Sequence, residues 1–194
     1  MPAPTPTSIY QIKVTLNGSK PPIWRRVLTP DIITLHQLHT ILQIVMGWTN
    51  SHLHQFIIDG DYYGDPDADE YNEMQNEKRY RLNQFVERKG FKFIYEYDFG
   101  DSWDHTVQVE SVLSIQKGAP YPICLEGKRA CPPEDIGGIS GYYDLLKIFS
   151  NPKHPEHDDL MEEFGEDFNP GFFDIEDVNL GLRRYAARAR ITKL

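Results

Sequence analysis

The chain has 194 residues, a length that suits one large domain or one domain with an appended helical part. Apolar residues make up 40% of it, and its 10 Phe, 11 Tyr and 3 Trp allow a substantial core. No apolar run approaches the roughly 18 residues that a membrane-spanning helix needs. Residues 1–8 lack the basic and apolar regions of a secretory signal and are expected to form an extended lead-in. We therefore expect a cytoplasmic protein with reduced cysteines and no membrane partner.

The net charge of −9 at pH 7 argues against general affinity for nucleic acid, but the charge is unevenly spread. Residues 59–77 contain eight acids and residues 156–177 contain ten, in both cases without Lys or Arg. Residues 178–194 carry four Arg and one Lys without any acid. Two interpretations stay open for this basic tail. It pairs with acidic segments of the same chain, which the overall charge favours, or it binds nucleic acid.

The first part of the chain predicts the order strand, strand, helix, strand. Residues 9–16 alternate between polar and apolar side chains, as a half-buried strand does, and residues 23–28 form the return strand. Thr34 begins a helix with a capping box, and this helix should end before Gly47, which suits a left-handed C-terminal position. Residues 48–58 alternate again and are predicted to be a strand.

The second part predicts a further hairpin followed by helices. The acidic segment 59–77 is interpreted as a long surface loop. The remaining expected elements are a short helix at 82–88, strands at 91–97 and 102–112, an irregular stretch at 114–138, and helices at 142–149, 156–164 and 174–190. This order indicates an α+β fold with an antiparallel or mixed sheet and an opening that is β-grasp-like in element order. We expect one domain over residues 9–194, with a helical C-terminal part at 141–190.

The most informative stretch, residues 95–105, surrounds a Gly100–Asp101 turn with acids, a tryptophan and a histidine. If these two residues alone form the turn, Glu96 lies opposite His105 on the neighbouring strand. A carboxylate there would raise the histidine pKa, which suits a general acid or base. The predicted catalytic group is His105, Glu96, Asp98 and Asp101. The alternative is a purely structural cross-strand pair.

A second candidate site lies in the segment Ser51-His52-Leu53-His54. In a strand, His52 and His54 project from one face, and such a pair can bind a divalent transition metal together with a carboxylate. His105, with Glu96 or Asp98 as the carboxylate, would complete the ligand set if the two strands adjoin. The alternative is that both histidines are polar residues at the edge of a strand.

Several of these motifs together resemble the plasmid pRiA4b ORF-3-like family. The resemblance runs from about residue 10 to residue 185 and is carried by Trp24-Arg25-Arg26, Gly47-Trp48, residues 51–56, residues 97–105, Cys124 and residues 131–138. It implies a shared fold and an association with plasmids or other mobile elements, and it assigns no reaction.

Three hypotheses for function remain open. The first is a binding module for a protein or small ligand, with a surface formed by Trp48, Tyr95, Tyr97, Trp103, Glu134 and Asp135. The loop that carries Glu134 and Asp135 is rich in Pro and Gly, so it either presents these carboxylates to a ligand or clamps the hairpin. The second is a metal-assisted hydrolase or nuclease, and the third is a nucleic-acid accessory protein.

Overall fold

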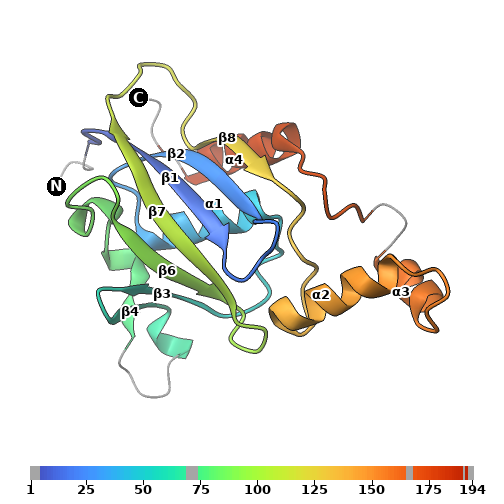
Figure 1. Cartoon of the computed structure of the whole chain (residues 1–194). Helices are drawn as coiled ribbons and strands as arrows, with labels where there is room; N and C mark the ends of the chain where they lie inside the picture. Colours follow the sequence, from blue (N-terminus) through green and yellow to red (C-terminus); the bar gives the residue numbers. More distant parts are fainter. Residues whose placement is uncertain (1–4, 69–73, 165–167, 190, 192–194) are drawn as a thin grey trace.

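A computed structural model describes residues 5–68, 74–164, 168–189 and 191 (Figure 1). The described residues form an α+β fold around one eight-stranded sheet with the order β5-β4-β3-β6-β7-β1-β2-β8. All neighbouring strands are antiparallel except β4 and β5. The strands are β1 (Ile9–Leu16), β2 (Trp24–Pro30), β3 (His54–Ile58), β4 (Asp61–Gly64), β5 (Gln75–Asn76), β6 (Lys92–Tyr97), β7 (Trp103–Leu113) and β8 (Ile123–Lys128).

Helix α1 (Leu35–Met46) covers one face of the sheet (Figure 1). It begins with the predicted capping box, because the Thr34 hydroxyl accepts the Gln37 N–H and the Gln37 side chain accepts the Thr34 N–H. It ends at Gly47 with a φ of 96°. Its apolar stripe packs on the inward residues of the strands, and this cluster forms the core. The predicted α+β class is therefore confirmed.

The C-terminal helices occupy two different places. Helix α4 (Ile175–Ala189) packs against α1 and β8, and its Asn179 side chain bonds both the N–H and the C=O of Cys124. This side chain therefore satisfies part of the free edge of β8. Helices α2 (Gly138–Phe149) and α3 (His157–Phe164) form an arm that projects from the end of the sheet (Figure 1).

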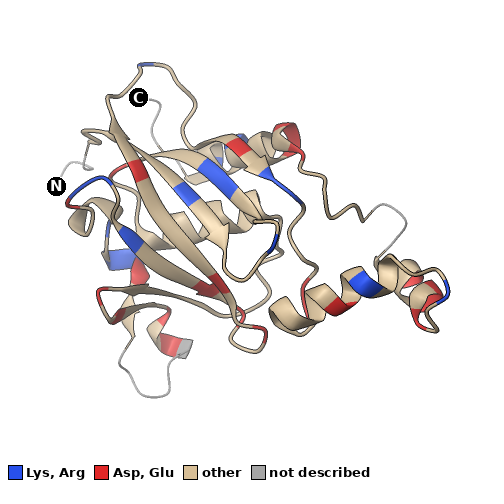
Figure 2. Ribbon diagram, viewed as in Figure 1, with Lys and Arg blue, Asp and Glu red and all other residues tan. Residues whose placement is uncertain are grey.

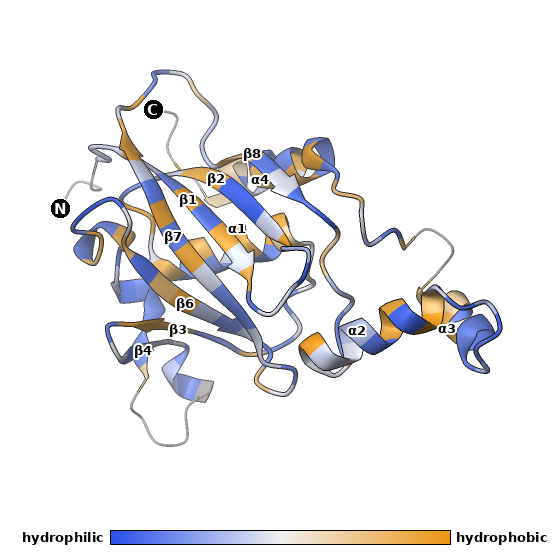
Figure 3. Cartoon of the chain, in the orientation of Figure 1, coloured by the Kyte–Doolittle hydropathy of each residue, from blue (hydrophilic) through white to orange (hydrophobic). Residues whose placement is uncertain are grey.

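Sequence periodicity located the long elements and missed the short ones. Bands of high and low hydropathy alternate along β1 and β7 in Figure 3, as the period of two requires. The segment expected to be an acidic loop contains β4 and β5, with residues 69–73 outside the described part. Strand β8 lies within the stretch expected to be irregular, and the helix expected at 82–88 is one 3-10 turn at Leu82–Gln84. These elements are short, so periodicity carries little information about them.

The basic tail does not pair with acids in the part of the chain that the structure describes. Arg183, Arg184 and Arg188 are exposed on α4, and none of them forms an ion pair with a described residue. Arg190 and Lys193 lie outside the described residues. Among the described helices, none is both long and apolar enough to cross a bilayer.

Candidate functional site

The hairpin between β6 and β7 does not have the predicted register. Tyr95 pairs with His105 and Glu96 pairs with Asp104, so the loop comprises residues 98–102 instead of Gly100 and Asp101 alone. Asp98 and Ser102 have positive φ values of 59° and 51°, and the Ser102 N–H donates to the Asp98 carbonyl at 2.6 Å. The prediction was wrong because the Asp98 side chain caps a longer loop. A shift of one residue places Glu96 and His105 on opposite faces of the sheet.

His105 belongs to the core. Its side chain has no exposed area, and its Nδ1 lies 3.2 Å from the Tyr95 carbonyl oxygen, to which it donates. Burial lowers the pKa of His105 to about 4, so the ring is neutral at pH 7. On the other face, the Glu96 carboxylate accepts a hydrogen bond from Gln55 Nε2 at 2.7 Å. The proposed Glu96–His105 pair therefore does not form.

The four aromatic residues expected to form a partner surface are buried as well. Trp48 is 8% exposed, and Tyr95, Tyr97 and Trp103 are fully covered. The ring centroids of Trp48 and Tyr97 are 4.8 Å apart, and those of Trp48 and Trp103 are 5.9 Å apart. These rings pack together under the hairpin, so they cannot anchor a partner, and the prediction of an aromatic surface was wrong.

Three other predicted residues meet at the end of the sheet: His52, Asp98 and Asp135, which we call the open cluster. One ligand atom from each lies within 4.8 Å of the other two. His52 Nδ1 is 3.6 Å from Asp98 Oδ2, and His52 Nε2 is 3.2 Å from Asp135 Oδ1. His52 Nε2 is buried and makes no hydrogen bond of acceptable geometry to a described residue. The cluster therefore contains a histidine nitrogen that could bind a ligand and that has no hydrogen-bond partner in the described part of the protein.

Asp98 is oriented by its own loop. Its Oδ1 accepts the backbone N–H of Gly100 at 3.0 Å and that of Asp101 at 3.4 Å, which leaves Oδ2 directed at His52. The Asp98 N–H donates to the Leu53 carbonyl at 2.8 Å, so the hairpin loop and the loop before β3 are joined. A carboxylate held in this way by backbone donors is typical of a metal ligand with a fixed orientation.

Asp135 is presented by the loop between β8 and α2, which is attached on both sides. Before it, Glu134 accepts hydrogen bonds from the Thr49 hydroxyl at 2.5 Å and from the Tyr97 hydroxyl at 2.6 Å. After it, Asp101 Oδ2 accepts the N–H groups of Ile136 and Gly137 at 3.2 Å each. This loop therefore clamps the hairpin, and the carboxylate of Asp135 between the two attachments stays exposed.

The attachments through Glu134 and Asp101 depend on a protonated Tyr97 hydroxyl and on a close approach between two segments of backbone. Burial and the bond to Glu134 raise the pKa of Tyr97 to about 12, so its hydroxyl remains a donor. A Cβ on Gly138 would lie 2.3 Å from the Asp101 carbonyl oxygen, so only glycine allows this approach. Four of the six described non-glycine residues with positive φ lie in the segments around the open cluster: Asn50, Asp98, Ser102 and Asp135. Such backbone strain concentrates at functional sites.

His54 lies elsewhere, in a group that sequence reasoning missed. Strand β3 begins only at His54, so His52 is in the preceding loop and the two rings do not share a face. His54 Nε2 lies 2.9 Å from Glu77 Oε2, and His36 Nδ1 lies 2.6 Å from Glu77 Oε1. We call His36, His54 and Glu77 the buried cluster. Burial favours the neutral acid, but the bonds from His36 and His54 outweigh it and lower the pKa of Glu77 to about 2.

His39 completes the structure around the buried cluster. Its ring stacks on His54 with centroids 3.4 Å apart. Its Nε2 lies 2.7 Å from Asn50 Oδ1 and its Nδ1 lies 2.8 Å from the Tyr95 hydroxyl. Burial lowers the pKa of His39 to about 3, so the neutral ring donates from Nε2 to Asn50 and accepts from Tyr95. No periodic signal in the sequence could have joined these residues, because they come from four separate segments.

The comparisons with known proteins agree with the fold and name no activity. The sequence model of the family described as plasmid pRiA4b ORF-3-like protein matches residues 8–177. Uncharacterized protein y4hQ of Sinorhizobium fredii (strain NBRC 101917 / NGR234) is 36% identical over 183 residues, which cover 93% of this chain and 94% of that protein.

A crystal structure of a protein of unknown function, MM3350 from Methanosarcina mazei Go1, is similar to this fold with a TM-score of 0.82. The two chains are 37% identical, and the match covers 89% of this chain and 97% of that one. The length of the family match and these identities are well above what a chance likeness gives. The chain therefore belongs to the plasmid pRiA4b ORF-3-like family.

Proposed function

We propose that this protein binds one divalent transition-metal ion at the open cluster, with His52, Asp98 and Asp135 as ligands. The single observation that carries the proposal is the convergence of one imidazole and two carboxylates from three separate loops. Neither His54 nor His105 takes part, since one is bonded to Glu77 and the other is in the core. The metal hypothesis is thus kept with a different ligand set.

The spacing of the donor atoms fits such an ion. Two donors at about 2.1 Å from one ion in tetrahedral geometry are about 3.4 Å apart. His52 Nε2, the ring nitrogen without a hydrogen-bond partner among the described residues, lies 3.2 Å from Asp135 Oδ1, which is close to this value. One imidazole with two carboxylates suits manganese, iron, cobalt or zinc better than calcium, which prefers oxygen ligands alone.

The exposure of the cluster suggests the class of reaction. The Asp135 side chain is 75% exposed, whereas the Asp98 side chain is only 10% exposed, so the cluster is anchored inside and open outside. An ion held by three protein ligands with an open position lowers the pKa of bound water and supports hydrolysis. We therefore favour a metal-assisted hydrolase over a partner-binding module, because the aromatic anchors of that module are buried.

The experiment is a titration of the chelator-treated protein with Mn²⁺, Co²⁺ and Zn²⁺ by calorimetry. We expect one site per chain. We also expect at least a tenfold loss of affinity in each of the variants His52→Ala, Asp98→Asn and Asp135→Asn. The visible spectrum of the Co²⁺ form reports the coordination geometry independently of any activity.

The matched control is His157→Ala. His157 Nδ1 lies 3.1 Å from Asp158 Oδ1, so this pair combines His with Asp without a third ligand. Its loss should leave the metal affinity unchanged. Equal affinity in the three cluster variants and the unaltered protein would refute the metal site. Hydrolysis of a chromogenic phosphodiester that needs metal and His52 would support the reaction class, and its absence in the metal-loaded protein would remove it.

A further inference from the structure

A second surface feature lies away from the open cluster. An open groove of about 760 Å³ runs between the end of β8, the start of β2 and the segment before α4. Its lining residues are Pro21, Pro22, Trp24, Gly127, Lys128, Arg129, Gly171, Phe172 and Phe173. Cations and aromatic rings therefore line the groove without any carboxylate, which is unusual for a chain with a net charge of −9.

The aromatic floor of the groove is held rigidly. The Arg25 guanidinium carbon lies 4.0 Å from the centroid of the Phe173 ring, and Arg25 Nε donates to the Val45 carbonyl at 2.7 Å. Arg25 is only 1% exposed, so it supports the ring from inside. A Cβ on Gly127 would lie 2.5 Å from Phe173 Cε1, which means that glycine makes room for this ring. The groove is thus preorganised.

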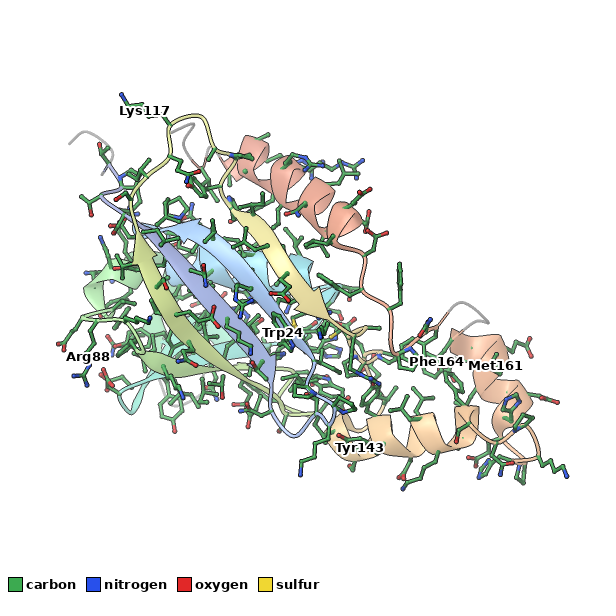
Figure 4. The ribbon with its side chains drawn as sticks, turned by 45° about the horizontal axis from the view of Figure 1, so that its top comes forward. Trp24, Arg88, Lys117, Tyr143, Met161 and Phe164 are labelled. Carbon is green, nitrogen blue, oxygen red and sulfur yellow. The ribbon has the colours of Figure 1, made fainter. Side chains whose placement is uncertain are left out.

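The aromatic surface above this floor is exposed. Phe172 is 59% exposed, and no described large hydrophobic residue is more exposed. Trp24 lies at the same groove on the sheet face that no helix covers (Figure 4). Lys13 Nζ and the Arg26 guanidinium carbon lie 4.6 Å and 5.0 Å from the Trp24 ring centroid. An exposed phenylalanine ring and a half-buried tryptophan ring beside cations indicate a surface for planar, anionic groups.

The charges of the groove favour an anion. Neither Lys128 nor Arg129 forms an ion pair with any residue of the described part of the chain. The nearby carboxylates Glu110 and Glu126 are both engaged by Arg26. Figure 2 shows Lys and Arg side by side on β1 and β2 and again at the end of β8. The groove lining, which contains two cations and no acid, therefore provides local complementarity for an anion.

We propose that this groove binds single-stranded nucleic acid, with bases stacked on Phe172 and Trp24 and phosphates at Lys128 and Arg129. Stacking on exposed rings combined with phosphate contacts is how sequence-tolerant proteins hold single strands. A site for one small molecule encloses most of its ligand, whereas this groove is open. A strand that crosses the groove gains from successive contacts, so a strand fits better than a free nucleotide.

The test is fluorescence anisotropy with a labelled single-stranded 12-mer of mixed sequence, in EDTA so that the open cluster contributes nothing. For two phosphate contacts we expect the affinity to fall about sevenfold between 50 and 200 mM salt. Phe172→Ala should weaken binding about fivefold or more, because it removes a stacking surface from an exposed position. Lys128→Ala should weaken binding and also flatten the salt dependence.

Two matched controls separate this groove from general effects. Leu125→Ala removes an exposed apolar side chain from the same strand outside the groove. Lys117→Ala removes an exposed cation far from Trp24 (Figure 4). Both should bind the 12-mer as the unaltered protein does, and urea unfolding checks that each variant is folded. The proposal is overturned if there is no binding at 50 mM salt, if either control weakens binding as much as its groove variant, or if AMP or a 12-base-pair duplex binds as tightly as the single strand.

Discussion

The open cluster and the buried cluster each combine histidine with carboxylate side chains, but only the buried cluster has its carboxylate fully hydrogen-bonded to histidines. In the buried cluster both Glu77 oxygens are bonded to histidines, and Glu77 is 2% exposed. In the open cluster His52 Nε2 makes no hydrogen bond to a described residue, and Asp135 is mostly exposed. Polar side chains that hydrogen-bond one another in the interior stabilise a fold. A ring nitrogen without a hydrogen-bond partner, next to an exposed carboxylate, is instead suited to binding a ligand.

The difference comes from where each acid sits. Glu77 is in a 3-10 helix next to α1, where it reaches histidines of α1 and β3. Asp98 and Asp135 are in loops that are anchored by their neighbours, so the backbone satisfies one side of the cluster only. We therefore expect the buried cluster to contribute to stability and the open cluster to bind the proposed ion. The following substitutions and conditions would test that division.

The largest expected effect is from Glu77→Gln. The amide keeps the shape and loses the charge that holds His36 and His54, so the free energy of unfolding should fall by about 3 kcal/mol. Urea unfolding measures this change. Asp67→Asn, an exposed acid in the same acidic segment, should change it by less than about 0.5 kcal/mol. A loss below about 1 kcal/mol for Glu77→Gln would show that the buried cluster is not structural.

Acid should lower the free energy of unfolding by an amount similar to that expected for Glu77→Gln. Burial lowers the pKa of His105 to about 4 and that of His39 to about 3, so both take up protons more readily when unfolded. The stability that each neutral ring provides is complete above about pH 6.5 and is lost as the pH falls toward the folded pKa. For His105 the loss is about 3 kcal/mol by pH 4. Urea unfolding from pH 7 to pH 4 measures it, and a flat profile would contradict the burial of neutral rings.

A smaller effect is expected from Asp101→Ala, which breaks the attachment between the hairpin and α2. Its carboxylate accepts two N–H groups at the start of that helix, so the loss should cost about 1–2 kcal/mol. Because Asp135 is then less well positioned, metal affinity should fall about tenfold. Asp144→Ala, an exposed acid of α2, serves as the control for both measurements. Unchanged metal affinity in Asp101→Ala would show that this loop does not position Asp135.

The smallest effect on stability is expected from His52→Ala. Its ring makes no hydrogen bond through Nε2, so the metal-free protein should lose less than about 0.5 kcal/mol. The variant should nevertheless lose the stabilisation by metal, which reaches about 2.7 kcal/mol in the unaltered protein at a metal concentration of 100 Kd. Thermal unfolding with and without Zn²⁺ gives both values. Severe destabilisation of the metal-free variant would place His52 with the structural histidines.

The sequence alone identified the individual residues of the open cluster and offered Asp98 as one of the carboxylates for His52, but it did not join Asp135 to them. His52 was predicted as a metal ligand, Asp98 as a catalytic acid and Asp135 as part of a partner surface. Their actual association depends on three loops meeting at the end of the sheet, and no periodicity encodes that meeting. The predicted Glu96–His105 pair failed by one residue of register, because the side chain of Asp98 lengthens the loop.

Local chemistry determined the family resemblance, the α+β class, the ends of α1 and the long strands, since propensity, capping and a period of two act over short distances. Tertiary structure decided which polar residues are buried with hydrogen-bond partners and which are exposed to solvent. Glu77 is in an acidic segment that looks solvated in the sequence, and it is buried because two histidines from distant elements bond it. Trp103 and His105 look like surface residues of a polar hairpin, and they are buried because they share the inward face of β7 with Val107 and Val109.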